Sequence, residues 1–208
     1  HPSRDEDGLP RRMWAGSRVQ FLAPIGLGVE VVRETTQLSA TNKTGRSGRM
    51  RFETLLHRFR VNGTLCLEEE QDIVYRAAGK NAALSPPDAA AVAPEISRSV
   101  FMDSIQLFRY SALTFNAHRI HYDLPYATET EGYPGLVVHG PFIATLLMDL
   151  FLRHRPQAAV KSFSFRAQRP IFCHDAFTLG LSPDQSGGDL VAIDAADALA
   201  VIARIDLA

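Results

Sequence analysis

Cysteine is scarce in this chain, whose 208 residues include only Cys66 and Cys173, far apart and in no Cys-x-x-Cys pattern. This scarcity argues against a disulfide framework and against a zinc site built from thiolates. A reducing cytoplasm is therefore the expected compartment. The sequence also lacks a signal peptide and any apolar run long enough to span a bilayer. Because it begins at His1 within a polar stretch, we expect the natural N-terminus to lie further upstream.

An excess of charge of either sign is also absent. The chain carries 22 basic and 23 acidic residues, for a formal net charge of -1. This balance gives no electrostatic case for a nucleic-acid or membrane partner. The hydrophobic fraction is 46%, which is ordinary for a globular protein and sufficient for a sizeable core.

The first region of the chain reads as short strands without a confident helix. Runs of alternating apolar residues occur in SRVQFLAPI, GVEVVRETTQLSAT, RMRFETLLHRFRV and LCLEEEQDIVYR, and the glycine-bearing NKTGRSG predicts a hairpin turn between two of them. The Ala-, Pro- and Ser-rich stretch that follows has no hydrophobic period and reads as an irregular linker. We therefore expect an N-terminal unit over residues 1–76, a linker over 77–99 and a C-terminal unit over 100–208.

The second region contains the one strong helix pattern, PFIATLLMDLFLRH, which begins at Pro141. Proline suits a first helical turn, and a helix that is apolar on nearly every side is usually buried. SIQLFRYSAL before it is predicted to be a strand, and four further strands are predicted after it. An antiparallel sheet wrapped around a central buried helix is the hot-dog architecture. We expect an α+β double hot-dog whose N-terminal unit is incomplete, because that unit lacks its helix; a plain α+β sheet with one covering helix is the alternative.

The stretch TFNAHRIHYD concentrates polar groups that do not suit a core. One interpretation is a metal site formed by His118, His121, Asp123 and His139, although the spacing matches no zinc motif. A second is acid–base chemistry, in which His121 accepts and returns a proton and Asn116 orients water or substrate. The third is a surface loop whose histidines bond to the backbone. The spacing leaves these interpretations open.

GLVVHGP stands immediately before the predicted helix. Gly140 lets the backbone approach a ligand closely, and the first N–H groups of a helix have no partner within it. A thioester carbonyl placed there would have its developing negative charge stabilised. The alternative is that Gly140 and Pro141 only start the helix. Elsewhere, Trp14 is a candidate anchor for a substrate chain and Arg166 a candidate contact for a phosphate or pantetheine arm, although both residue types are common in cores and at strand edges.

LFRYSALTFNAHRIHYDLPYA, followed by GYPGLVVHGPFIATLLMDL, resembles the MaoC-like hydratases and dehydratases of the hot-dog superfamily. Within that group it is most similar to the branch of 3-methylfumaryl-CoA (mesaconyl-CoA) hydratases and type 2 hydroxyacyl-thioester dehydratases. PRRMWAG, KTGRSG and EEQDIVYR extend the resemblance over nearly the whole chain. The wider group places an Asp five residues before its catalytic His. Here Asn116 takes the Asp position and His121 the His position, so a mechanism that relies on a carboxylate there is in doubt.

The resemblance implies a hydro-lyase that adds water to a 2-enoyl-CoA thioester, such as mesaconyl-CoA, or catalyses the reverse dehydration. It implies that His121 moves the proton, Asn116 holds the water and Gly140 faces the thioester carbonyl. The expected substrate-binding residues are His139, Val138, Arg166 and Trp14. No metal or other cofactor is expected, and the hot-dog units are expected to pair within the chain or as a homodimer. A fatty-acid-type 3-hydroxyacyl-thioester dehydratase, an acyl-CoA thioesterase and a non-catalytic acyl-thioester binding module are the rival functions, since fold alone does not choose among them.

Overall fold

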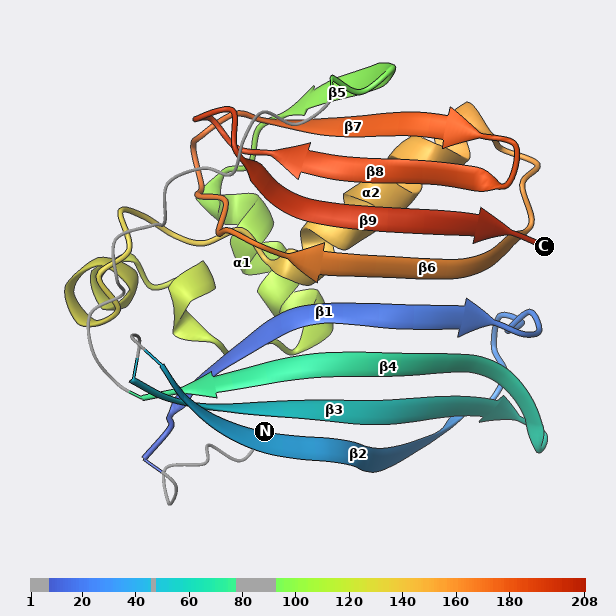
Figure 1. The fold of residues 1–208 in the computed structure, drawn as a ribbon, viewed down its shortest axis with the longest axis horizontal. Coiled ribbons are helices and arrows are strands. Elements are labelled where there is room, and N and C mark those ends of the chain that lie inside the picture. Colours follow the sequence, from blue (N-terminus) through green and yellow to red (C-terminus); the bar gives the residue numbers. More distant parts are fainter. Residues whose placement is uncertain (1–7, 46–47, 78–92) are drawn as a thin grey trace. The chain divides into compact units, whose positions relative to one another are not determined.

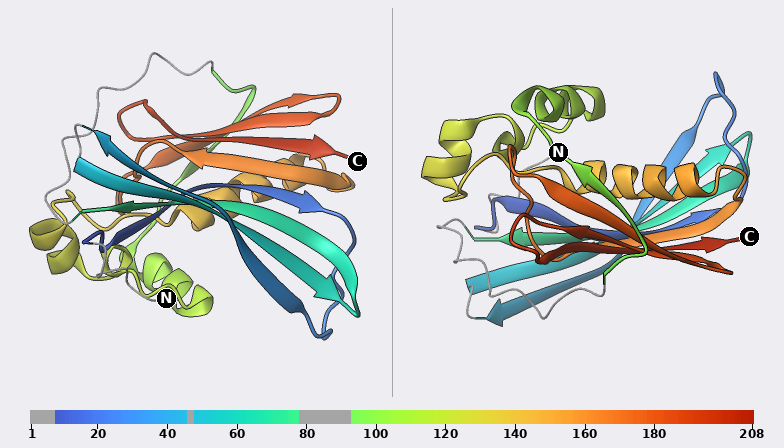
Figure 2. Two further views of the ribbon diagram at one scale, coloured as in Figure 1. Left: turned by 60° about the horizontal axis from the view of Figure 1, so that its bottom comes forward. Right: turned by 90° about the horizontal axis from the view of Figure 1, so that it is seen from above.

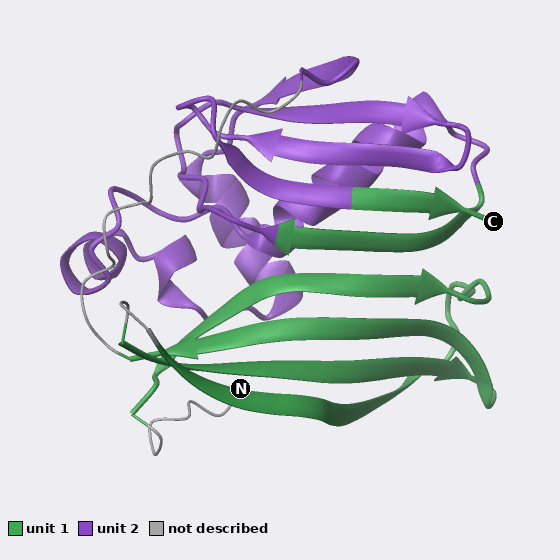
Figure 3. Cartoon of the chain, viewed as in Figure 1, with its two compact units in different colours: residues 1–78, 159–166, 204–208 green, residues 79–158, 167–203 purple. Residues whose placement is uncertain are grey.

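A computed structural model describes residues 8–45, 48–77 and 93–208 of the chain (Figure 1). The chain divides into two compact units, one of residues 1–78, 159–166 and 204–208 and the other of residues 79–158 and 167–203 (Figure 3). We refer to them as unit 1 and unit 2. In the part that the structure describes, no helix is both long and apolar enough to cross a membrane.

Unit 1 is an antiparallel sheet. Its strands are β1 (Arg11–Phe21), β2 (Val32–Gly45), β3 (Gly48–Val61), β4 (Thr64–Arg76), most of β6 (Val160–Ala167) and the end of β9 (Leu199–Leu207). The order β2-β3-β4-β1-β6 follows from the antiparallel pairing between neighbouring strands. The four predicted strands of this region are therefore confirmed. Strands β2, β3 and β4 pair in chain order, whereas β1 pairs with β4 and not with β2. Gly45 pairs with Gly48 across the expected hairpin, whose residues 46–47 lie outside the described part. The described residues of unit 1 include no helix.

The two faces of this sheet differ in chemistry. Leu9, Ile73 and Tyr75 form a small buried cluster against Leu55 and Ala77. Other strand positions carry ion pairs between neighbouring strands: Arg18 with Glu70 and Asp72, and Arg58 with Glu68. These carboxylates of β4 are therefore paired with arginines of the neighbouring strands.

Gly16 allows β1 to approach β6 closely. It lies at an irregularity in the β1–β4 register and pairs with Arg166 on β6. A Cβ atom at this position would overlap the carbonyl oxygen of Phe165. We expect Gly16→Ala to lower the free energy of unfolding by about 1–3 kcal/mol, the usual cost of overpacking. Urea denaturation measures this, with Gly26→Ala as the control because its Cβ would meet only Val29 Cγ1 at 3.6 Å. Equal stability of Gly16→Ala and wild type would refute this account of the strand contact.

Unit 2 combines helices with a smaller sheet. The sheet runs in the order β5 (Ile96–Val100), β7 (Phe177–Asp184), β8 (Gly187–Ile193) and the first part of β9. Helix α2 (Gly140–His154) contacts β7 and β8, and Figure 2 shows it lying along the sheet. Its buried side chains are Ile143, Ala144, Leu147, Leu150 and Phe151. The predicted buried helix is confirmed, with a proline in its first turn as expected.

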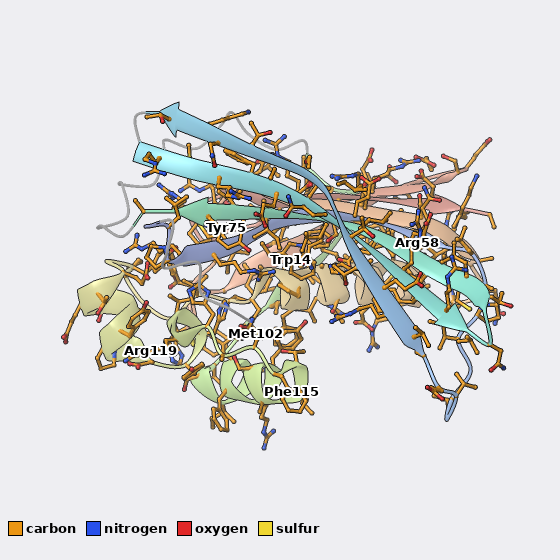
Figure 4. All side chains as sticks on the ribbon, turned by 90° about the horizontal axis from the view of Figure 1, so that it is seen from below. Trp14, Arg58, Tyr75, Met102, Phe115 and Arg119 are labelled. Atoms are coloured by element: carbon orange, nitrogen blue, oxygen red, sulfur yellow. The ribbon has the colours of Figure 1, made fainter. Side chains whose placement is uncertain are left out.

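One predicted strand was wrong. SIQLFRYSAL forms helix α1 (Ser104–Thr114), which begins with a capping box between Asp103 and Gln106 and ends at Phe115 in the left-handed conformation, with φ of 52°. Figure 4 shows Phe115 beside the end of this helix. The strand prediction failed because the apolar residues of this segment do not mark a buried face. Helix α1 buries Leu107 and Ser111, and its exposed apolar residues, with its C-cap, are Ile105, Phe108, Leu113 and Phe115. The capping signal, Asp-x-x-Gln, was the better guide to local structure here.

The expected linker is shorter at its C-terminal end than the sequence suggested. Residues 96–99 lie in β5, which pairs with β7. Most of the remaining segment, residues 78–92, lies outside the described part of the chain. The domain boundaries at 76 and 99 stay a prediction.

Candidate active site

The residues of the candidate site come from three neighbouring segments of unit 2. The loop after α1 holds Asn116, the short 3₁₀ helix η2 (Arg119–His121) holds His121, and the segment before α2 holds His139. A π-helix, η3 (Tyr126–Thr130), follows η2. His139 is the N-cap of α2, so the site lies at the positive end of a 15-residue helix.

His121 is buried, and one of its ring nitrogens is already committed. Its Nδ1 lies 2.7 Å from the carbonyl oxygen of Val137. A carbonyl only accepts hydrogen bonds, so Nδ1 carries the proton and donates it. The neutral ring therefore presents an unprotonated Nε2. This is the tautomer that a general base requires, and the backbone of Val137 selects it.

His139 lies against His121. The two rings stack with centroids 3.7 Å apart and planes 19° apart. His139 is fully buried, and its Nε2 lies 2.8 Å from the hydroxyl oxygen of Ser111 on α1. Tyr110, also on α1, contacts the His139 ring with a centroid separation of 4.8 Å and stacks on Phe142 of α2. Helix α1 thus fixes the position of His139, and His139 fixes that of His121.

Both histidines are held neutral. Burial, the neighbouring His139 and, to a smaller extent, His118 lower the pKa of His121 from 6.5 to about 3, while the bond to Val137 opposes the change. Burial and then His118 lower the pKa of His139 from 6.5 to about 4. Desolvation disfavours the charged imidazolium, and two stacked imidazoliums would repel each other. At neutral pH the site therefore offers two neutral imidazoles.

These shifts predict that acid destabilises the fold. The lowered pKa values mean that the unfolded chain binds more protons than the folded one between pH 6.5 and about 3–4. Stability is therefore full above pH 6.5 and falls below it, by up to about 1.4 kcal/mol per pH unit for each histidine. Urea denaturation at pH 7 and pH ~5.5 measures the slope. His121→Gln is expected to flatten it and the exposed His154→Gln to leave it unchanged; an identical slope in all three proteins contradicts the prediction.

Asn116 is tied to its own loop. Its Oδ1 accepts the backbone N–H of His118 at 3.1 Å, and its own N–H donates to the carbonyl of Ser111 at 2.9 Å. These bonds turn the chain from α1 towards η2. The side chain is half-buried. A carbonyl oxygen has a second lone pair, and the amide nitrogen has two protons, so Asn116 retains capacity to bind a ligand.

Space is open beside Gly140. This residue is the first of α2, and a Cβ atom built on it would meet no atom within 4 Å. Protein packing therefore does not require glycine here. Its N–H, at the first helical position, has no partner within the helix. The neighbouring Val138 is buried and donates its N–H to Ile171 at 2.8 Å, so its backbone amide serves the fold.

The geometry does not favour a metal site. No cluster of three or more metal-ligating side chains occurs in residues 8–45, 48–77 and 93–208. Asp123 is paired with Arg119 at 2.6 Å and accepts the N–H of Tyr126, so its carboxylate is engaged in the loop. Arg119 in turn lies over the Tyr126 ring, 4.2 Å from its centroid. Arg119 and Asp123 therefore shape the loop around η2.

The family model described as hydroxyacyl-thioester dehydratase type 2 matches residues 1–173. The chain belongs to this family. Mesaconyl-C(4)-CoA hydratase from Chloroflexus aurantiacus is 47% identical over 199 residues, which are 95% of this chain and 71% of that protein. The expected membership of the hot-dog hydratase and dehydratase group is thereby confirmed.

Solved structures confirm the fold of this family member. HtdX from Mycobacterium tuberculosis matches with a TM-score of 0.75 at 17% identity, over 94% of this chain and 76% of HtdX. A second protein from Mycobacterium tuberculosis, described as having a double hot-dog fold, matches with a TM-score of 0.66 at 13% identity, over 96% of this chain and 75% of that one. The predicted α+β double hot-dog is therefore correct.

Two residues predicted to bind substrate lie in unit 1. Trp14 donates from Nε1 to the Ser17 hydroxyl at 2.9 Å, and its ring meets Phe165 edge-on with centroids 5.0 Å apart. Arg166 is an exposed residue of β6. Within unit 1, Trp14 therefore contacts residues of its own strand and of the neighbouring strand β6. Substrate contacts of Trp14 and Arg166 stay predictions.

The contacts of α1 with His139 were not predicted from the sequence. Ser111 and Tyr110 fall in the segment expected to be a strand, where no contact with His139 was foreseen. Once Asp103 and Gln106 are seen to start a helix, Tyr110 and Ser111 fall in its last turns. His139 itself was identified as a substrate contact and, in the metal interpretation, as a ligand together with His121, but the stacking of the two rings was not predicted.

Proposed function

We propose that the chain is a hydro-lyase that adds water across the double bond of a 2-enoyl-CoA thioester and catalyses the reverse dehydration. The observation that carries the proposal is the buried, neutral His121, whose Nδ1–H is held by Val137 so that Nε2 is an available base. Family membership and the similarity to mesaconyl-C(4)-CoA hydratase support this reaction class. From that relative we propose mesaconyl-CoA, a short branched dicarboxylic thioester, as the substrate.

In the proposed mechanism His121 moves one proton in each direction. Its Nε2 accepts a proton from water as the water oxygen bonds to C3 of the enoyl group. The electron pair of the double bond moves towards the thioester carbonyl, giving an enolate. The resulting imidazolium then returns the proton to C2, so that one water is added in total. Enolate charge beside the imidazolium favours the protonated ring, which offsets the low basicity that burial gives His121 in the free protein.

The other two predicted residues serve this reaction from the loop and the helix. Gly140 leaves space for the thioester carbonyl, and its N–H donates to the oxygen as negative charge develops. Asn116 orients the attacking water through the lone pair and amide protons that its loop bonds leave available. Because the thioester itself acidifies the carbon next to it, we propose that no metal or redox cofactor takes part.

Asn116→Asp tests whether position 116 faces the base. A carboxylate near His121 favours the imidazolium and raises the pKa of His121 above its wild-type value of about 3, by roughly 1–3 units. We expect the acid limb of kcat/KM to move to higher pH by a similar amount. Ala117→Asp adds the same charge at an exposed position of the same loop and is the matched control. An unchanged limb in Asn116→Asp, or equal movement in both variants, would count against a direct role for Asn116.

A 3-hydroxyacyl-thioester dehydratase of the fatty-acid type is the second candidate, favoured by the description of the matching family model. Hydration rates on mesaconyl-CoA, crotonyl-CoA and longer 2-enoyl-CoA thioesters separate the two. Preference for the short dicarboxylic substrate supports the first, and preference for long chains the second. If the protein turns over none of these thioesters, both candidate functions are wrong.

We further propose a cytoplasmic location and a hot-dog pair formed within the chain or as a homodimer. Cys66 and Cys173 are both free and buried, as suits a reducing compartment.

A further inference from the structure

His139 carries a buried polar atom that the fold does not satisfy. Its Nε2 is bonded to Ser111 at 2.8 Å, but its Nδ1 has no hydrogen-bond partner and no exposure to solvent. A buried donor or acceptor without a partner lowers the stability of the folded protein. Nothing in the stacking of His139 on His121 requires a nitrogen at that position, because a phenyl ring would stack as well. We therefore infer that the hydrogen-bond partner of His139 Nδ1 is an atom of the substrate.

The contact with Ser111 decides which nitrogen of His139 is protonated. A serine hydroxyl has one proton to donate. Among the described residues, the Ser111 hydroxyl has no acceptor other than His139 Nε2. Donation from Ser111 to Nε2 is therefore the arrangement that leaves no buried hydroxyl proton unused. Nε2 is then the acceptor, and the proton of the neutral imidazole resides on Nδ1.

Two candidate donors, the Nδ1–H of His139 and the backbone N–H of Gly140, belong to consecutive residues at the start of α2. His139 is the N-cap of α2, and Gly140, with its amide free of helical bonding, is the next residue. The space beside Gly140 is open. The positive end of the helix also disfavours an imidazolium, in the same direction as burial. A neutral imidazole donor at a helix N-terminus can polarise a carbonyl without bringing a charge into the site.

We propose that His139 is a catalytic residue of the proposed hydratase reaction, donating its Nδ1–H to the thioester oxygen beside the N–H of Gly140, and that Ser111 is the positioning residue that fixes this tautomer. The inference rests on the proposed function for its substrate, a CoA thioester. As water adds at C3, the electron pair of the C2=C3 double bond forms a C1=C2 bond, and the carbonyl π pair moves onto the thioester oxygen. Two donors then meet the enolate, and both bonds strengthen as charge develops.

The stacking with His121 fits this division of roles. Rings stacked 3.7 Å apart cannot hydrogen-bond to each other, because their N–H groups and lone pairs lie in the ring planes. Each histidine therefore keeps its nitrogens for other partners: His121 for Val137 and water, His139 for Ser111 and the thioester. A neutral His139 also avoids repelling the imidazolium that forms on His121 during the reaction.

The carbonyl stretch of a bound thioester tests the proposal directly. Butyryl-CoA labelled with ¹³C at the carbonyl is saturated and cannot be hydrated, so its infrared band in the complex reports polarisation alone. We expect wild type to lower the frequency relative to free butyryl-CoA. His139→Phe, which keeps a stacking ring, should return the band a large part of the way to the free value, and His139→Asn, which restores a donor near Nδ1, should keep most of the shift. An equal shift in wild type and His139→Phe, or no shift in wild type, overturns the proposal.

Kinetics and the tautomer give independent readouts. His139→Phe should lower kcat by about 10²–10³-fold, the cost of one oxyanion donor, with little change in KM. If His139→Phe does not fold, the ¹⁵N chemical shifts of the wild-type histidines test the proposal. They should show a neutral His139 that is protonated at Nδ1. Ser111→Ala should give a mixture of the two His139 tautomers. An Nε2-protonated His139 in wild type overturns it. A wild type that polarises the carbonyl but hydrates no enoyl-CoA would refute the proposed function, and with it the catalytic role of His139, and would leave only the contact of His139 with the thioester oxygen standing.

Discussion

His121→Ala is expected to lower kcat by about 10²–10⁴-fold, the usual contribution of a general acid–base residue. The physical reason is the tautomer that Val137 selects, because it leaves Nε2 of His121 unprotonated and able to accept a proton from water. A steady-state assay that follows loss of enoyl-thioester absorbance measures the effect. KM should change less than kcat, since His121 acts on the water more than on the thioester.

The control for His121→Ala is His154→Ala. His154 is an exposed histidine at the C-terminal end of α2, so its removal should leave both kcat and KM near wild type. Circular dichroism on both variants separates loss of chemistry from loss of fold, because removal of a buried ring also leaves a cavity. A folded His121→Ala protein with wild-type turnover would remove His121 from the mechanism.

Gly140→Ala is the second variant with a large expected effect, and its two consequences point in opposite directions. The new Cβ meets no protein atom within 4 Å, so stability should stay the same or rise by up to about 1 kcal/mol as the unfolded chain loses freedom. Activity should fall on the order of 10²-fold, because the methyl group occupies the space in which the thioester oxygen meets the helix N-terminus. A stable but impaired enzyme is the expected result.

Gly135→Ala is the matched comparison for Gly140→Ala. Its Cβ also meets nothing within 4 Å, but Gly135 does not begin a helix. Its kcat/KM should remain close to wild type, while that of Gly140→Ala falls. Thermal unfolding shows whether both variants are folded. Wild-type kcat/KM in Gly140→Ala would mean that the thioester does not approach the backbone at this residue.

Much of the fold could be predicted because most of its strands follow one rule. The alternation of apolar and polar residues predicts strands β3 and β4, and their antiparallel register pairs apolar residues with each other, Phe52 with Val74 and Phe59 with Leu67. Helix α2 was predictable for a different reason, since its apolar residues continue for four turns after Pro141. In both cases burial and local propensity agree.

Helix α1 could not be predicted from burial because it buries too little. Ser111, one of its two buried residues, is polar, so its core-facing side carries almost no hydrophobic pattern. This also hid part of the site. His121 and Gly140 stand within recognisable motifs, but the contact of His139 with Ser111 joins residues 28 positions apart and depends on α1 being helical. The fold brings these groups together, and no local spacing encodes that contact.

We propose that the neutral, buried histidine pair at the N-terminus of α2 hydrates an enoyl-CoA thioester. Following enoyl absorbance and free thiol together, after the purified chain is mixed with mesaconyl-CoA or crotonyl-CoA, tests this hydration. We predict that absorbance is lost on at least mesaconyl-CoA while no thiol is released, because water adds to the double bond and the thioester stays intact. Unchanged absorbance on both substrates, or absorbance loss matched by stoichiometric thiol, would contradict the account.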